Sequence, residues 1–223
     1  MKRSNINKPI LGVMIIHSLL IALSLFLPSM DKTDVNKIYA INIVPFRLDD
    51  GRIYGTGSYM KYKGKTYVIT NKHVCEGGLK HRAKKDNSLR VDKVVSKVLK
   101  ISNKHDLCAL ESDRISGLKV SKSRANPLDK ITIIGYPRGI GKVIRHGRVI
   151  RDYIISLGFQ NPLYTATQID ILAYPGNSGS PILNKNGQVV GVLFAGNPMF
   201  PHEPAMVPYK DLIKFLESLK DVK

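Results

Sequence analysis

Three short segments of the sequence carry side chains that could act together in nucleophilic catalysis. His73 follows an apolar run, Asp106 precedes another, and Ser178 lies in a glycine-rich turn. A serine hydroxyl is a poor nucleophile at neutral pH unless a neutral imidazole takes its proton. That imidazole in turn needs a carboxylate that fixes its tautomer and stabilises its protonated form. The three residue types therefore indicate acyl transfer through a serine.

Each of these residues also has an ordinary interpretation when it is taken alone. A histidine after a strand is usually a surface or packing residue, an aspartate before a strand belongs to a turn, and Gly176–Gly179 is a loop. Their order along the chain is more informative: His73, Asp106 and Ser178 follow one another at intervals of 33 and 72 residues. The glycines beside Ser178 allow two backbone N–H groups to point at one spot, where an oxyanion could be stabilised.

The residues around these side chains resemble trypsin-like serine peptidases, most closely the bacterial high-temperature-requirement (Deg) group. Thr70–Val74 is similar to the TN-x-HV motif of that group, Asp106–Leu110 to its DLA-V/L motif, and Gly176–Pro181 to its GNSGG-P/A turn. Weaker similarities lie in three further segments: Gly55–Ser58, Ile133–Pro137 and Ala205–Pro208. The resemblance extends from about Ile38 to Leu219, and we expect no appended PDZ domain.

The resemblance implies a serine endopeptidase that works through an acyl-enzyme. His73 would be the general base and then the general acid, Asp106 would orient it, and Ser178 would attack. The backbone N–H groups of Gly176 and Ser178 would form the oxyanion hole. Ser180 departs from the pattern, because the group has glycine there. No cofactor or metal is implied. Two other functions stay open: a catalytically inactive domain that only binds, and a basic protein that binds nucleic acid or an anionic surface.

Substrate specificity is expected to depend on two segments of the second half of the chain. The resemblance places the specificity pocket at Leu172, Phe194 and Ala195. Pockets that select Arg or Lys hold an aspartate six residues before the nucleophile, and Leu172 occupies that position. We therefore expect an apolar side chain before the cleaved bond.

The two cysteines of the chain each follow a proposed catalytic residue by two positions. If His73 and Asp106 touch, Cys75 and Cys108 lie in one neighbourhood, and an exported domain would favour a disulfide between them. The alternative is a pair of small buried apolar residues, since side chains two positions on need not face each other. No zinc-type cysteine spacing is present.

The first thirty residues (1–30) have the pattern of a membrane anchor or an export signal. Residues 10–27 carry no charge, and a helix of 18 residues just reaches across a bilayer core. The length of this run favours an uncleaved anchor over a cleaved signal peptide. Lys2, Arg3 and Lys8 should stay cytoplasmic. We therefore expect the working domain to be extracytoplasmic, either periplasmic or extracellular.

The rest of the chain has the pattern of an all-β protein. About ten short runs rich in Ile, Val, Tyr and Thr are separated by turn residues, and Asn186-Gly187 is a hairpin signal. Only the end, residues 209–220, has helical periodicity. With the resemblance, this predicts two antiparallel β-barrels of the chymotrypsin type, at 38–115 with His73 and Asp106 and at 128–208 with Ser178, followed by a C-terminal helix.

The formal net charge of +18 is high for 223 residues. The basic residues concentrate in Leu79–Lys104 and Arg138–Arg151. A solvated basic face is the simplest interpretation, and attraction to anionic lipid or acidic substrates is the alternative. We expect a protein or peptide substrate as partner. Binding to nucleic acid is disfavoured, because no helix-turn-helix, zinc or aromatic stacking motif is present.

Overall fold

The computed structural model describes residues 40–44, 55–80, 87–91, 94–139, 141–156, 163–197 and 200–220. All of them belong to one compact unit, Tyr39–Lys223. The apolar segment 10–27, expected to be a membrane or signal helix, lies outside the described residues. Neither helix that the described ranges contain combines the length and the apolar character needed to span a bilayer.

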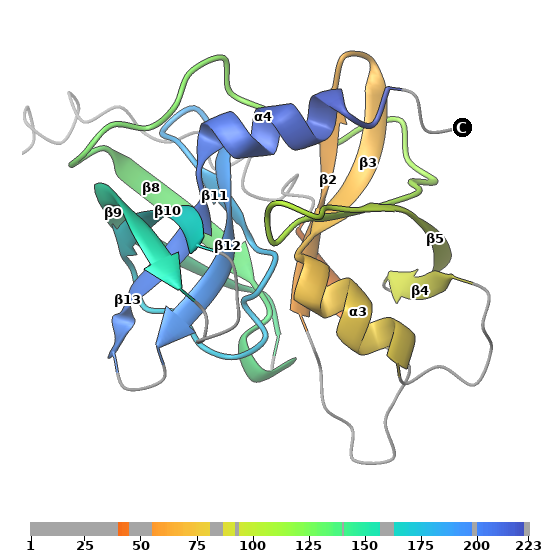
Figure 1. Ribbon diagram of the computed structural model, residues 1–223, viewed down its shortest axis with the longest axis horizontal. Coiled ribbons are helices and arrows are strands. Elements are labelled where there is room, and N and C mark those ends of the chain that lie inside the picture. Colours follow the sequence, from red (N-terminus) through yellow and green to blue (C-terminus); the bar gives the residue numbers. More distant parts are fainter. Residues whose placement is uncertain are drawn as a thin grey trace, which may run out of the picture. The chain divides into compact units, whose positions relative to one another are not determined.

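The described part of the chain is mostly β-structure, arranged in two sheets (Figure 1). The first sheet contains β1 (Ala40–Val44), β2 (Gly55–Tyr62), β3 (Lys65–Thr70), β4 (Ser88–Val91), β5 (Val94–Ile101), β6 (Cys108–Leu110) and β7 (Leu118–Lys119), with α3 (Lys72–Lys80) between β3 and β4. The second contains β8 (Lys130–Gly135), β9 (Val143–Ser156), β10 (Leu163–Asp170), β11 (Pro181–Leu183), β12 (Val189–Asn197) and β13 (Phe200–Val207). A 3₁₀-helix at Pro137–Gly139 follows β8, and α4 (Tyr209–Glu217) follows β13.

The first sheet runs in the order β1-β4-β5-β6-β3-β2-β7. Strand β1 is antiparallel to both β4 and β2. The first six strands in this order therefore form a closed circuit of paired strands, and β7 lies outside it. In the middle, β3 lies beside β6 with Thr70 opposite Cys108. This register places the end of β3 beside the start of β6. His73 comes shortly after β3 and Asp106 shortly before β6, so the two residues are brought close together.

The second sheet closes into a six-stranded barrel in the order β10-β13-β12-β11-β8-β9. Alternate residues of β8, such as Ile131 and Ile133, point into the barrel and are buried, as the twofold repeat of a strand requires. The barrel has its own apolar core, separate from the core of the first sheet. The predicted hairpin is confirmed: β11 and β12 are antiparallel, and Gly187 at the turn has φ +69°.

Helix α4 buries one apolar stripe, made by Leu212, Phe215 and Leu216. It contacts β12 of the barrel. Its far end reaches the β2–β3 turn, where Glu217 accepts from Lys63 Nζ at 3.3 Å and from Tyr62 Oη at 3.4 Å. Figure 1 shows the helix lying across the ends of strands from both sheets. The predicted C-terminal helix is therefore confirmed.

The expectation that only the end of the chain is helical is wrong, because residues 72–80 form α3. The sequence does not predict this helix because it contains Gly77 and Gly78, and glycine disfavours helix interiors. Its stability comes from tertiary contacts that bury Val74 and Cys75. Strand β13 also escaped prediction, because Pro201 and Pro204 interrupt it. With α3 and α4 included, the described part of the chain is still mostly β-structure.

Candidate active site

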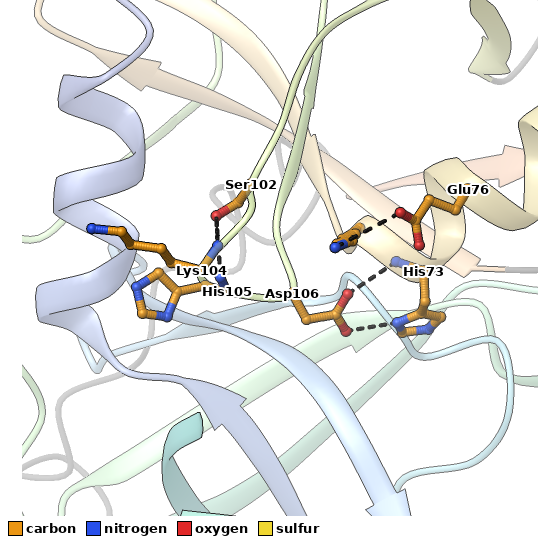
Figure 2. Close-up of polar contacts among 7 residues, drawn as sticks. His73, Glu76, Ser102, Lys104, His105 and Asp106 are labelled. Atoms are coloured by element: carbon orange, nitrogen blue, oxygen red, sulfur yellow. Dashed lines mark hydrogen bonds and ion pairs between the residues drawn. The ribbon is translucent and has the colours of Figure 1, made fainter. Parts of the chain in front are cut away.

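The side chains of His73 and Asp106 are joined directly in the structure. His73 Nδ1 lies 2.6 Å from Asp106 Oδ2, and the backbone N–H of His73 donates to Asp106 Oδ1 at 2.9 Å (Figure 2). An ionised carboxylate can only accept, so the ring proton must be on Nδ1. In the neutral ring, the other nitrogen, Nε2, then carries no proton and can act as a base. The His73 side chain is 47% exposed and that of Asp106 only 9%, so the base can meet a substrate while its partner is shielded.

The bond from the backbone of His73 also ties Asp106 to the start of α3. The first N–H groups of a helix have no partner within it, and a carboxylate there is favoured by the helix dipole. The Asn71 side chain completes the arrangement, because its Nδ2 donates to the Asp106 carbonyl oxygen at 2.8 Å. Asn71 is fully buried. Asp106 therefore holds the ring and the backbone of His73 together, and the turn that begins α3 holds Asp106.

A disulfide links the helix of His73 to the strand that follows Asp106. Cys75 on α3 and Cys108 at the start of β6 are bonded, with their Cα atoms 6.5 Å apart. Both cysteines are fully buried in the core of the first sheet. The bridge closes a loop with a sequence separation of 33 residues, and a loop of this length is worth about 3–4 kcal/mol in the chain-entropy account.

The segment around Ser178 forms a tight turn between β10 and β11. Gly176 and Gly179 have φ values of +94° and +87°, a region that residues with a Cβ avoid. The backbone N–H groups of Asn177, Gly179 and Ser180 donate to protein carbonyls. Among the described residues, no acceptor faces the N–H groups of Gly176 and Ser178. These are the two donors predicted to form the oxyanion hole.

The turn of Ser178 and the helix of His73 both approach Gly55 at the start of β2. A Cβ atom placed on Gly55 would lie 2.5 Å from Val74 Cγ2 and 3.0 Å from the Ser178 carbonyl oxygen. The residue after His73 and the backbone of Ser178 therefore meet at one glycine. In the part of the chain that the structure describes, no hydrogen bond joins Ser178 Oγ to His73.

Thr56 uses all of its polar groups to join the Ser178 turn to Thr70 and Tyr136. Its N–H donates to the Ser178 carbonyl at 2.7 Å, and its hydroxyl donates to the Gly176 carbonyl at 2.7 Å. The same hydroxyl accepts from the N–H of Tyr136 at 3.0 Å, and its carbonyl accepts from Thr70 Oγ1 at 2.7 Å. Thr56 is fully buried. Thr56 lies in Gly55–Ser58, one of the weaker similarities named above, but that similarity assigned it no role.

Ser180, which stands where the resembled group has glycine, is accommodated by Gly135. The Ser180 side chain is fully buried and its hydroxyl faces the position that a Gly135 Cβ would fill. Asn177 Oδ1 would lie 2.5 Å from the same Cβ. A residue with a side chain at 135 would therefore displace the turn. Ser180 does not have a positive φ, so the substitution for glycine carries no backbone strain.

His105, next to Asp106, faces helix α4 instead of His73 (Figure 2). Its Nε2 lies 3.5 Å from Asp211 Oδ1. Burial lowers the pKa of His105 below its ordinary value, and the charges of Lys214 and Lys104 act in the same direction. The Asp211 carboxylate opposes this shift without cancelling it. Protonation of the imidazole beside α4 is thus disfavoured.

The residues assigned to the specificity pocket are only partly described. Leu172 is half-buried, between Ile171 and Ala173, which belong to the barrel core. Phe194 on β12 is buried with 5% of its surface exposed. The side chain of Ala195 lies outside the described residues. Strand β12, which carries Phe194, adjoins the Ser178 turn, because the Leu193 carbonyl accepts from the N–H of Gly179 at 2.8 Å.

Comparison with known proteins agrees with this arrangement. A solved structure of Rv3671c from M. tuberculosis H37Rv, in an inactive form, superposes with a TM-score of 0.65 at 18% identity, over 86% of this chain and 91% of that one. The serine endoprotease from Yersinia pestis gives 0.63 at 21% identity, over 86% and 67%. The MamO protease domain from Magnetospirillum magneticum gives 0.59 at 18%, over 79% and 95%. At such low sequence identities, the structural similarity establishes the fold alone.

The family model described as the trypsin-like peptidase domain matches residues 55–192, more than half of the chain. This match includes all three proposed catalytic positions, His73, Asp106 and Ser178. The resemblance stated from the sequence is therefore confirmed, and the chain belongs to the trypsin-like peptidase family.

Proposed function

We propose that the protein is a serine endopeptidase in which His73, Asp106 and Ser178 form a catalytic triad. The observation that supports this proposal most strongly is the pair of hydrogen bonds between Asp106 and His73. Two hydrogen bonds, at 2.6 and 2.9 Å, fix both the ring and the backbone of the histidine. A purely structural ion pair would not need the histidine to keep its outer nitrogen free and half-exposed. A general base needs both.

The proposed reaction follows from the roles of these groups. Ser178 Oγ attacks the substrate carbonyl carbon while His73 Nε2 takes the hydroxyl proton. The N–H groups of Gly176 and Ser178 donate to the oxyanion of the tetrahedral intermediate. His73 then gives its proton to the leaving amine, which departs and leaves an ester on Ser178. Water then attacks the ester while His73 takes its proton, and His73 returns that proton to Ser178 Oγ as the acid is released.

Ser178 must complete its contact with His73 during this cycle. A serine side chain turns about a single bond between staggered positions. Hydrogen bonds of catalytic groups are often long without substrate and tighten when it binds. The half-buried position of Ser178, on a turn fixed by Thr56 at Gly176 and at Ser178 itself, is consistent with such a rotation.

The finer architecture belongs to the same proposal. We assign residues 38–115 to a first β-barrel of the chymotrypsin type, supported by the circuit of pairings through β1. Residues 128–208 form the second. Leu172 six residues before Ser178 supports a preference for an apolar side chain before the cleaved bond, with Phe194 and Ala195 in the same pocket.

We also propose that residues 10–27 anchor the protein in a membrane and that the peptidase domain is extracytoplasmic. The Cys75–Cys108 disulfide supports this location, because disulfides persist in oxidising compartments. Separation of membranes from soluble protein at alkaline pH should leave the full chain in the membrane fraction. Recovery of the uncleaved chain in the soluble fraction would contradict the anchor.

The activity itself is tested with two serines of one turn. The full chain should hydrolyse a mixture of unstructured peptides, and Ser178→Ala should lose at least about 10³-fold in kcat. Ser180→Ala, which removes a hydroxyl two residues away, should keep most of the rate. Peptide hydrolysis is followed by mass spectrometry. Equal activity of Ser178→Ala and the wild type would contradict the proposal.

A further inference from the structure

Two arginines flank an aromatic ring directly before the Ser178 turn. Arg138 Cζ lies 4.9 Å from the centre of the Tyr174 ring, and Arg145 Cζ lies 5.7 Å from it. Tyr174 stands four residues before Ser178. The two guanidinium groups come from different elements, the 3₁₀-helix after β8 and strand β9. Stacking on one ring holds both in a fixed place.

The backbone of Arg138 is part of the turn that would bind the oxyanion. Its N–H donates to the Pro175 carbonyl at 2.7 Å. A Cβ on Gly176 would lie 2.8 Å from the same nitrogen, so the two backbones are in close contact. Arg138 has φ +51°, a left-handed conformation that non-glycine residues seldom adopt. Such strain persists only where the surroundings impose it, and it gathers at functional sites.

Neither guanidinium has an acidic partner among the side chains that the structure describes. No carboxylate of these ranges lies within ion-pair distance of Arg138 or Arg145. The Nε of Arg145 is buried and has no hydrogen-bond partner. A buried donor without an acceptor is unfavourable. The planar fork of a guanidinium matches a carboxylate, which accepts two parallel hydrogen bonds from it. Arg138 is exposed and Arg145 is half-buried, so both side chains can meet an acceptor that arrives from outside.

We propose that Arg138, Arg145 and Tyr174 form a binding site for a carboxylate of the peptide substrate, close to the scissile bond. This inference rests on the proposed peptidase function. The residue before the cleaved bond is expected to be apolar, so the carboxylate comes from another position, either an Asp or Glu side chain or the carboxyl terminus of a short peptide. The net charge of +18 would add attraction for acidic substrates at a distance.

The test uses the full chain and matched peptides. Cleavage of a sequence-randomised peptide mixture first locates the position at which Asp and Glu are enriched. Paired peptides then carry Glu or Gln at that position, each with a free or an amidated carboxyl terminus, so that the two sources of the carboxylate are separated.

The wild type should cleave the acidic peptide with a kcat/KM about tenfold or more above its neutral partner. The double variant Arg138→Gln/Arg145→Gln should lose this preference, chiefly through KM.

Arg148→Gln is the matched control. It removes the same charge from the same strand, three positions from Arg145 and on the opposite face. It should keep the preference for the acidic peptide. A preference unchanged in the double variant, or lost equally in Arg148→Gln, would overturn the inference. So would an equal fall of kcat on all peptides, which would assign the arginines to the oxyanion.

The same experiment separates failure of this inference from failure of the proposed function. A wild type that hydrolyses peptides but does not distinguish Glu from Gln or acid from amide overturns the carboxylate site alone. A wild type that hydrolyses none of the peptides overturns both.

Discussion

Single residues in this protein hold the proposed catalytic groups by using several polar atoms at once. Asp106 accepts from both the ring and the backbone of His73. Thr56 uses its N–H, hydroxyl and carbonyl to join the Ser178 turn to β2 and β3. The bonds that Thr56 makes with the Gly176 carbonyl and with Thr70 are buried, so the loss of one leaves an unsatisfied partner that water cannot reach. Geometry at the site therefore depends on side chains that never touch a substrate.

Thr56→Val tests this dependence with almost no change of shape. The substitution removes the donor to the Gly176 carbonyl and the acceptor for the N–H of Tyr136. Leaving a buried group unpaired costs about 1–3 kcal/mol in stability. If Thr56 positions the oxyanion donors, kcat should also fall about 10- to 100-fold with little change in KM. Urea unfolding and peptide hydrolysis measure the two effects.

Thr56→Ser keeps the hydroxyl and serves as the control, so it should recover most of kcat. A Thr56→Val variant that is less stable but retains the wild-type kcat would show that Thr56 supports the fold and does not position the turn.

At the scale of elements, two connections hold the segment of Asp106 from opposite sides. The disulfide joins it to α3 through Cys108, and His105 joins it to α4 through Asp211. Lys100 adds to the second connection, because its Nζ donates to the Ser218 carbonyl at 3.0 Å. Helix α4 follows the barrel in sequence yet contacts the loops of the first sheet. It therefore helps to fix Asp106 relative to the barrel that carries Ser178.

The burial of His105 makes stability depend on pH. The folded protein lowers the pKa of His105 from 6.5, chiefly by burial. As pH falls below about 6.5, the unfolded chain takes up a proton that the folded chain resists. The free energy of unfolding should therefore decrease with falling pH in this window and be independent of His105 above it. His105→Gln, which cannot titrate, should show a smaller decrease.

Urea unfolding at pH 7.5, 6.5 and 5.5 measures this difference between the wild type and His105→Gln. Parallel curves for the two proteins would mean that burial of His105 does not affect its protonation.

At the scale of the whole molecule, the sequence predicted what depends on local pattern and on motif order. The hairpin at Asn186-Gly187 and the helix from Tyr209 follow from turn chemistry and from a 3.6-residue period. Helix α3 could not be predicted in this way. Its partners, Asp106 and Cys108, are more than thirty residues away in sequence, and its own glycines argue against a helix.

The proposed site likewise contains residues that local motifs predict and residues that only the fold brings together. Motif order predicted His73, Asp106 and Ser178 as the catalytic residues, because each lies in a recognisable local pattern. Thr56 acts on Gly176 across 120 residues, and no local signal shows such a contact. Arg138 and Arg145 were visible only as part of a basic run. Their common position on Tyr174 depends on how β8 and β9 pair with each other and meet the Ser178 turn.

The central claim is that Ser178 is a nucleophile activated by His73. A fluorophosphonate reacts with a serine only when a neighbouring base has activated it, so labelling of the full chain followed by peptide mapping tests this claim most directly. We predict one label, on Ser178, which is lost in both Ser178→Ala and His73→Ala. No label on the folded wild-type protein, or a label on Ser178 that persists in His73→Ala, would contradict it.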